Sequence, residues 1–345
     1  MPARMLLAAV ALLGASMSCA AARDLTVVSR GADSIEPLRQ VFVQTFVGAT
    51  AIGVRQESWD GGIEALEAHL KAPDDGWDLV ELRGDELAAA CADGLLEKLD
   101  FGAIGGKDHY LAQGVSDCGV GAAMTNVVLA WDRDKFQATP TWVDFWDIAK
   151  YPGKRGLFRG PRGNLEIALI ADGVVPADVY KVLGTADGVE RAFHKLDQLK
   201  PYLVWWQTGE EAEHILSSGD VLMTSAPSDR TAMAARGGPR NFGMQWTASL
   251  SEVKSWAIVK GSPNLRQAMQ FLYFAGTPAI EGRLLEVAGA SGLAKGANDG
   301  LPPELAAISP TVPANLGAAI RFDDGFWRDN QAKLGQRFDA WLAQH

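Results

Sequence analysis

The chain has 345 residues, of which 48% are hydrophobic, and its formal net charge is −10. This length and apolar content suit one large domain or two linked domains with a substantial core. Nucleic-acid binding needs a basic surface, and the chain is acidic without any run of Lys or Arg, so we expect no nucleic-acid partner.

The first 22 residues have the pattern of an export signal. Arg4 precedes an apolar run from Met5 to Gly14, and small residues follow at 18–22. This pattern predicts a signal peptide over residues 1–22 and a periplasmic mature protein. The apolar run is shorter than the roughly 20 residues that a membrane span needs. Cys19 could mark a lipoprotein, but Ser16 stands where such sites usually have Leu, so we expect no lipid anchor.

The region after the signal alternates between strand and helix patterns. Strands are predicted at 25–28, 51–54 and 77–82, and helices at 35–46, 61–70 and 85–91. Alternation of this kind predicts an α/β unit with a mostly parallel sheet flanked by helices. Open sheets of this type bind ligands where the carboxyl ends of their strands meet.

The same alternation continues to the end of the chain. Further strands are predicted at 127–132, 156–159, 202–205, 220–225 and 256–259, and helices at 140–147, from 165, at 265–275 and at 326–342. At the start of the helix over 140–147, Thr141 is a predicted N-cap, and Asp144 three residues later completes a capping box.

Two cysteines remain after the signal, Cys91 and Cys118. An even pair in an exported chain predicts a disulfide. The bond would close a loop of about 27 residues and contribute about 3 kcal/mol in the chain-entropy model. Two buried free thiols are the alternative.

Catalytic and metal-binding patterns are absent from the sequence. The five histidines are scattered without ligand spacing, and no Walker loop, dinucleotide fingerprint, zincin motif or nucleophile elbow occurs. We therefore expect no cofactor, no metal and no enzymatic activity. The rival from the enzyme class is an exported α/β hydrolase, which would need a Ser–His–acid geometry that the spacing does not suggest.

Several segments together resemble the spermidine/putrescine-type periplasmic solute-binding proteins of ABC importers. They lie at 116–121, 129–132, 141–147, 151–156, 218–221 and 255–258. The resemblance covers essentially the whole mature chain. It implies a type II two-lobe clamshell that captures a small solute by hinge closure and delivers it to the membrane subunits of an importer. We expect a monomer, and a sensor or chemoreceptor role is the alternative within this class.

The resemblance also implies where the lobes divide. Lobe one is expected to contain 24–131 and 254–298, and lobe two 132–253 and 299–345. The hinge is expected near 131–132, 253–255 and 298–299.

Two departures from the polyamine-binding pattern bear on the ligand. Polyamine binders usually have an Asp just before the strand at 255–258, where this chain has Lys254. They also place carboxylates after the strand at 156–158, whereas residues 159–164 contain none and include Arg159 and Arg162. Because a like charge in a desolvated cleft opposes a polyamine, these departures indicate an anionic or zwitterionic ligand. A true spermidine/putrescine-binding protein is the alternative.

The candidate ligand-binding residues mostly follow predicted strands. They are Arg30, Trp59, Arg83, Arg159, Arg162, Trp206, Ser225, Ser228, Arg230 and Lys254. Arg suits a carboxylate because its planar fork matches two oxygens. The tryptophans could pack on the carbon skeleton of the ligand, and the serines could donate hydrogen bonds. Each also has an ordinary alternative: a surface ion pair for the arginines, core packing for the tryptophans, and a plain loop with a helix N-cap for 225–230.

Overall fold

The computed structural model describes residues 23–71, 76–237 and 240–344. The predicted signal peptide at 1–22, including Cys19, lies outside the described residues. Within the described residues, no helix is both long and apolar enough to cross a membrane.

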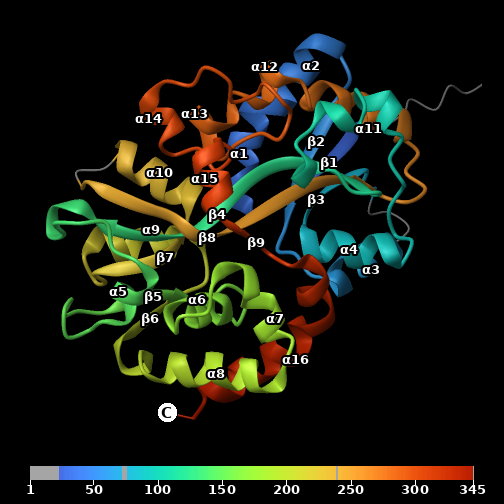
Figure 1. Ribbon diagram of the computed structural model, residues 1–345. Coiled ribbons are helices and arrows are strands. Elements are labelled where there is room, and N and C mark those ends of the chain that lie inside the picture. The colour runs from blue at the N-terminus through green and yellow to red at the C-terminus, as the bar shows by residue number, and fades with distance from the viewer. Residues whose placement is uncertain (1–22, 72–75, 238–239, 345) are drawn as a thin grey trace, which may run out of the picture.

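In the described part of the chain, nine strands form one mixed sheet (Figure 1). They are β1 (Leu25–Arg30), β2 (Val54–Trp59), β3 (Leu79–Arg83), β4 (Gly119–Asp132), β5 (Arg155–Phe158), β6 (Leu203–Trp206), β7 (Met223–Pro227), β8 (Phe242–Ile258) and β9 (Ile320–Arg321). Their order is β2-β1-β3-β8-β4-β7-β5-β6, with β9 beside β8. Strands β1, β2 and β3 are parallel at one end and β5, β6 and β7 at the other, while β4 and β8 run antiparallel between them.

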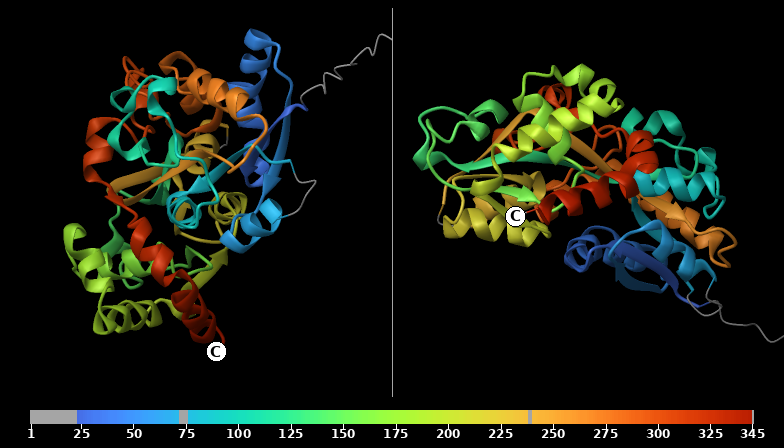
Figure 2. Two further views of the ribbon diagram at one scale, coloured as in Figure 1. Left: turned by 90° about the vertical axis from the view of Figure 1, so that its right-hand side faces the viewer. Right: turned by 90° about the horizontal axis from the view of Figure 1, so that it is seen from below.

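Helices cover the sheet on both sides. The first set is α1 (Ile35–Leu38), α2 (Gln44–Thr50), α3 (Ile63–Lys71), α4 (Gly84–Ala92), α5 (Trp142–Trp146), α6 (Asn164–Ala171), α7 (Val179–Leu183) and α8 (Ala186–Asp197). The second set is α9 (Gly209–Ser218), α10 (Ser228–Gly237), α11 (Leu265–Ala275), α12 (Pro278–Glu281), α13 (Leu284–Ala288), α14 (Pro303–Ala306), α15 (Pro313–Ala318) and α16 (Asp324–Leu342). The last helix, red in Figures 1 and 2, ends at the surface and packs on α8 through Phe193, Phe338 and Trp341.

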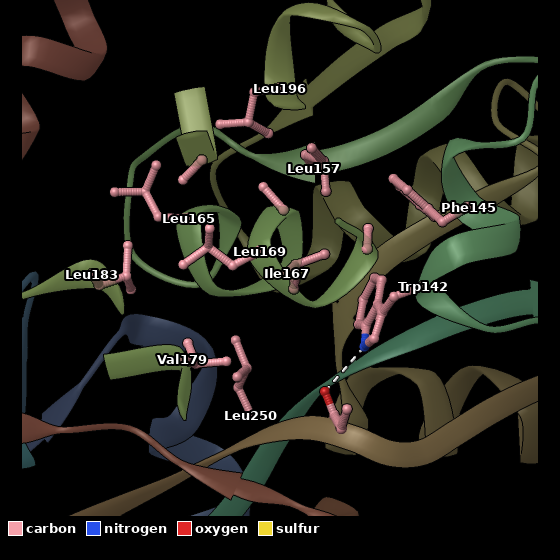
Figure 3. Packing of buried hydrophobic residues seen from close by; sticks show 14 of the residues in the cluster. Trp142, Phe145, Leu157, Leu165, Ile167, Leu169, Val179, Leu183, Leu196 and Leu250 are labelled. Atoms are coloured by element: carbon pink, nitrogen blue, oxygen red, sulfur yellow. Dashed lines mark hydrogen bonds between the residues drawn. The ribbon is translucent and has the colours of Figure 1, made fainter. Parts of the chain in front are cut away.

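The buried apolar residues form separate cores at the two ends of the sheet. Two clusters draw on residues 25–123 and 256–297, and this part is termed the first half. The other two draw on residues 129–250 and 320–341, termed the second half. In the second half Trp142 is buried and donates a hydrogen bond from Nε1 to the carbonyl of Ala248 at 3.0 Å (Figure 3). Strands β4 and β8 are common to both halves.

Most predicted elements are confirmed, and the differences have local causes. The second strand begins at Val54 rather than at 51, because Ala51 adopts a left-handed conformation (φ 57°) that ends α2. The helix expected over 35–46 is interrupted by a π-helical segment at Arg39–Val43. Strands β4 and β8 are far longer than the predicted 127–132 and 256–259. The first residues of β4 lack a clear alternation of apolar and polar side chains, whereas residues 242–250 of β8 do alternate, and this signal was missed.

Two local predictions are also confirmed. Thr141 accepts a hydrogen bond from the backbone of Asp144, and the Asp144 carboxylate accepts one from the backbone of Thr141. Cys91 and Cys118 form a disulfide with a Cα–Cα distance of 5.8 Å, which joins α4 to the residue before β4.

The carboxyl group of Glu281, at the end of α12, predicts a pH-dependent stability. Glu281 is buried and accepts a hydrogen bond from the backbone of Ala294 at 2.6 Å, and burial raises its pKa to about 8. Between the unfolded pKa of about 4.5 and the folded value, only the folded chain holds this proton, so stability falls as pH rises. In that window the free energy of unfolding of the natural chain should fall by about 1.4 kcal/mol per pH unit because of Glu281. We expect the Glu281→Gln variant to lack this fall.

Chemical denaturation at pH 5, 7 and 9 measures this effect. The difference between Glu281→Gln and the natural chain should grow with pH in favour of the variant. The exposed Glu286 on α13 supplies the control, because Glu286→Gln should leave the pH profile unchanged. Parallel pH profiles for the natural chain and Glu281→Gln would contradict the assignment.

Candidate functional site

Several predicted site residues occupy the carboxyl ends of strands. Arg30, Trp59, Arg83 and Trp206 are the last residues of β1, β2, β3 and β6, and Arg159 directly follows β5. The structure thus places polar groups where open α/β sheets bind ligands. Their individual environments differ, and these decide which of them can reach a ligand.

A cavity of about 180 Å³ lies between the two halves. Its lining comes from the region of α1, from β3, β4 and β8, and from α10 and α13. The halves approach closely beside it: Gly289, which follows α13 with φ 70°, lies against the start of α10, and a Cβ there would be 2.6 Å from the carbonyl oxygen of Asp229. A side chain at position 289 would force this contact apart.

Three charged side chains face this cavity from its walls. Lys254 on β8, Glu81 on β3 and Asp229 at the start of α10 all line it. Among the described residues, Lys254 makes no hydrogen bond or ion pair within 4 Å. Within these same residues, the Oδ1 atom of Asp229 is buried without a hydrogen-bond partner. Both groups therefore have bonding capacity left for a ligand.

The electrostatics of these groups reflect their burial. Burial raises the pKa of Glu81 and of Asp229, although the charge of Lys254 opposes both shifts. Burial alone would lower the pKa of Lys254, but Glu81, Asp229 and Glu252 raise it above its ordinary value. Lys254 is therefore positively charged at neutral pH.

The cavity rim contains an ion pair between the two halves. Arg230 on α10 donates to the carboxylate of Asp33, which follows β1. Arg230 was predicted as a site residue, and the structure gives it this partner. Because both side chains are partly exposed, the pair contributes little to stability, typically below about 1 kcal/mol.

Arg30 and Arg83 lie nearby, but each is already neutralised. Glu86 on α4 accepts from Arg30 Nε at 3.2 Å and from the backbone of Arg83 at 3.0 Å. The Arg83 guanidinium also lies 3.3 Å from Asp85. These two arginines lie near the cavity, but Glu86 and Asp85 of the first half already neutralise their charges.

Arg162 is buried and lies among three carboxylates, of which Asp85 is buried and Glu252 and Asp324 are partly exposed. Its Nη1 lies 2.7 Å from Glu252 on β8 and 3.5 Å from Asp85 on α4, and its Nη2 lies 3.6 Å from Asp324 on α16. The guanidinium also lies 4.1 Å from the ring centroid of Phe322. Arg162 therefore connects the second half to α4 of the first half.

The remaining predicted residues have varied surroundings. Trp59 is buried in the first half, where Nε1 donates to the carbonyl of Glu81. Trp206 packs on Phe158, and its Nε1 has no hydrogen-bond partner among the described residues. The Ser228 hydroxyl accepts from the backbone of Asn126 on β4. The Ser225 hydroxyl is buried and has no hydrogen-bond partner among the described residues. Arg159 is exposed.

Sequence reasoning missed the carboxylates of the cavity. Asp229 stands between Ser228 and Arg230, both of which were selected, and Glu81 is the single charge inside the buried part of β3. A lone charged residue in a buried strand was a usable signal, because an ionised group is rarely buried without a partner.

A second, larger cavity of about 650 Å³ borders α4, the loop at 113–117 and the start of α16. Its lining includes Val253 and Ser255, which alternate with Lys254 along β8 and so point to the opposite face of the sheet. Lys98, Asp117 and Arg321 there are exposed, so water already satisfies them. The smaller cavity, where the buried Oδ1 atom of Asp229 and the ammonium of Lys254 have no partner among the described residues, is the better candidate site.

Comparison with known proteins identifies the class. Residues 42–312 match the family described as bacterial extracellular solute-binding protein. The chain is 37% identical over 339 residues to the gamma-aminobutyric acid-binding protein of Pseudomonas aeruginosa PAO1, covering 97% of this chain and 96% of that one.

Solved structures agree. The structure of the Atu4243-GABA receptor matches with a TM-score of 0.84 and 28% identity, over 94% of this chain and 98% of that chain. An ABC transporter substrate-binding protein from Bradyrhizobium japonicum USDA 110 matches with a TM-score of 0.83 and 28% identity, over 92% and 99%.

The chain therefore belongs to the bacterial extracellular solute-binding proteins. The predicted resemblance, the type II clamshell and the role as the solute-binding component of an ABC importer are confirmed. The proteins compared are binding proteins rather than enzymes.

Proposed function

We propose that this protein captures a small zwitterionic amino acid, of the γ-aminobutyrate class, in the cavity between its halves. The observation that supports this most directly is the pairing of two unsatisfied groups of opposite charge, the Lys254 ammonium and the Asp229 carboxylate, on the walls of one cavity. A ligand carboxylate would bind Lys254, and a ligand ammonium would bind Asp229.

The charge balance favours a zwitterion over the other ligands considered. The lining contains the cations Arg230 and Lys254 and the carboxylates Asp33, Glu81 and Asp229, so negative charge is in excess by one. A purely anionic ligand would increase that excess, and a diamine would leave Lys254 without an anion. A zwitterion satisfies both groups and leaves the balance unchanged.

The size and the apolar wall support a short aliphatic chain. The cavity is comparable to an engineered one of about 150 Å³ that binds benzene, so it suits a ligand with few heavy atoms. Leu38, Leu284 and Val287 line it beside the charged groups. Methylene groups between a ligand's two charges would pack against this wall.

The relatives support the same ligand class. Both the Pseudomonas aeruginosa relative and the Atu4243 structure are named for γ-aminobutyrate. We infer that the protein acts in the periplasm after removal of residues 1–22, as a monomer that delivers its ligand to importer membrane subunits. Closure would bend β4 and β8 between the two cores, with lobes close to the predicted 24–131 plus 254–298 and 132–253 plus 299–345.

Calorimetry with a matched ligand series tests the proposal. We expect γ-aminobutyrate to bind in the micromolar range or tighter. Butyrate, n-butylamine and putrescine, which each lack one of the two charges, should bind at least about tenfold more weakly, because one charge-assisted contact contributes about 1.5–3 kcal/mol. Equal or tighter binding of putrescine would instead support a polyamine carrier.

A further inference from the structure

The charged residues around Lys254 indicate which ligands the cavity excludes. Lys254 lies opposite Arg83 on β3 and Ala123 on β4. Glu252, opposite Thr125, is two residues earlier on β8 and so on the same face of the strand. Glu81 and Asp229 line the cavity with Lys254, whereas the Glu252 carboxylate is already bound to Arg162 at 2.7 Å. Two carboxylates therefore share the cavity with one ammonium group.

The other cations near the cavity are committed elsewhere. Arg30 is bound to Glu86 at 3.2 Å, and Arg230 is bound to Asp33. Within the described residues, Lys254 is therefore the cation lining the cavity that lacks a dedicated carboxylate partner. Its positive charge therefore balances the carboxylates of Glu81 and Asp229 together.

A cavity wall with these carboxylates and no lysine would be a good site for two ammonium groups. One would bind at Asp229, and the second would bind beside Glu81. In this chain the second position already contains the Lys254 ammonium. A diamine would have to bring its second positive charge against a like charge in a partly desolvated cavity, and this repulsion opposes its binding.

We propose that Lys254 is the residue that selects amino acids over diamines: its ammonium group permanently occupies the position among the carboxylates that the second ammonium of a diamine would need. The same charge then offers a binding point for the carboxylate of the ligand. This inference rests on the proposed function, and it adds that one side chain decides between two ligand classes.

Calorimetry on Lys254 variants tests the selection. Lys254→Met keeps an unbranched apolar side chain and removes the charge. It should weaken γ-aminobutyrate binding at least about tenfold and strengthen putrescine or cadaverine binding at least about tenfold. Lys254→Arg keeps the charge and should still exclude both diamines. Thermal unfolding of each variant confirms that it is folded.

A rescue experiment separates charge selection from a merely structural role. In Lys254→Ala, millimolar ethylammonium should restore part of the γ-aminobutyrate affinity, whereas ethanol should not. The natural chain should show no such response. Unchanged diamine affinity in Lys254→Met, together with no rescue in Lys254→Ala, would overturn the inference.

The two proposals fail in different ways. If the natural chain binds none of the ω-amino acids, the proposed ligand class is wrong. The gain of diamine binding in Lys254→Met is still measurable in that case, so the role of Lys254 is tested independently of the ligand.

Discussion

Replacing Asp229 by Asn is expected to weaken γ-aminobutyrate binding at least about 30-fold. The Oδ1 atom of Asp229 is buried without a hydrogen-bond partner, so an incoming ammonium group would be its counter-ion. Losing one partner of a buried charge pair costs 2–5 kcal/mol or more, which corresponds to this loss of affinity. Calorimetry measures the dissociation constant, and thermal unfolding should show no loss of stability in the ligand-free variant, because the Oδ1 atom of Asp229 has no hydrogen bond within the described residues to lose.

Asp33 provides the matched control for Asp229. Its carboxylate also lines the cavity, but it is partly exposed and already paired with Arg230. Asp33→Asn should therefore change the affinity by no more than a few-fold. If Asp33→Asn and Asp229→Asn reduce the affinity equally, the ligand ammonium does not bind at Asp229 in particular.

Replacing Arg162 by Met is expected to lower the free energy of unfolding by about 3–5 kcal/mol. Arg162 is buried and is the cation between Glu252, Asp85 and Asp324. Its positive charge lowers the pKa of Glu252 despite burial and opposes the rise that burial causes for Asp324. Without it, neighbouring carboxylates repel one another, and breaking a buried ion cluster from one side is strongly destabilising. Urea unfolding gives the free energy directly.

Arg321 is the control for Arg162. It pairs with the same Asp324 at 3.6 Å, but its side chain is 56% exposed. Arg321→Met should cost less than about 1 kcal/mol. Adding Glu252→Gln to Arg162→Met should recover part of the lost stability, because it removes one of the repelling charges. Equal costs for Arg162→Met and Arg321→Met would contradict the proposed importance of the cluster around Arg162.

The sequence was sufficient for the elements whose local signals are strong. The first and third strands, the cap at Thr141 and the Cys91–Cys118 pair all follow from short patterns, and the structure contains them. The two strands end at Arg30 and Arg83, slightly later than the predicted 28 and 82. The first part of β8 has an alternating pattern that was overlooked, but its pairing was not predictable, because it includes a bulge near Ala248, which has a φ of 56° and pairs with no residue of β4. Local sequence does not encode such a crossing between two cores.

The candidate site was only partly predictable for a related reason. Lys254 was selected because it departs from the polyamine-binding pattern, and Arg230 because it follows a predicted strand, but the role of each depends on carboxylates far away in the sequence. Asp33 is 197 residues from Arg230, and Glu81 reaches Lys254 only through the pairing of β3 with β8. Trp59 shows the converse: its position at a strand end suggested ligand contact, whereas its indole is buried against Trp77.

The shared strands β4 and β8 also determine the order in which the chain can fold during synthesis. The first half begins with residues 25–123, yet its cores also need residues 256–297, which emerge only after most of the second half has been made. The second half in turn needs residues 320–341. Neither half can complete its core from one uninterrupted stretch of chain, so the early segments must remain partly unfolded until late in translation.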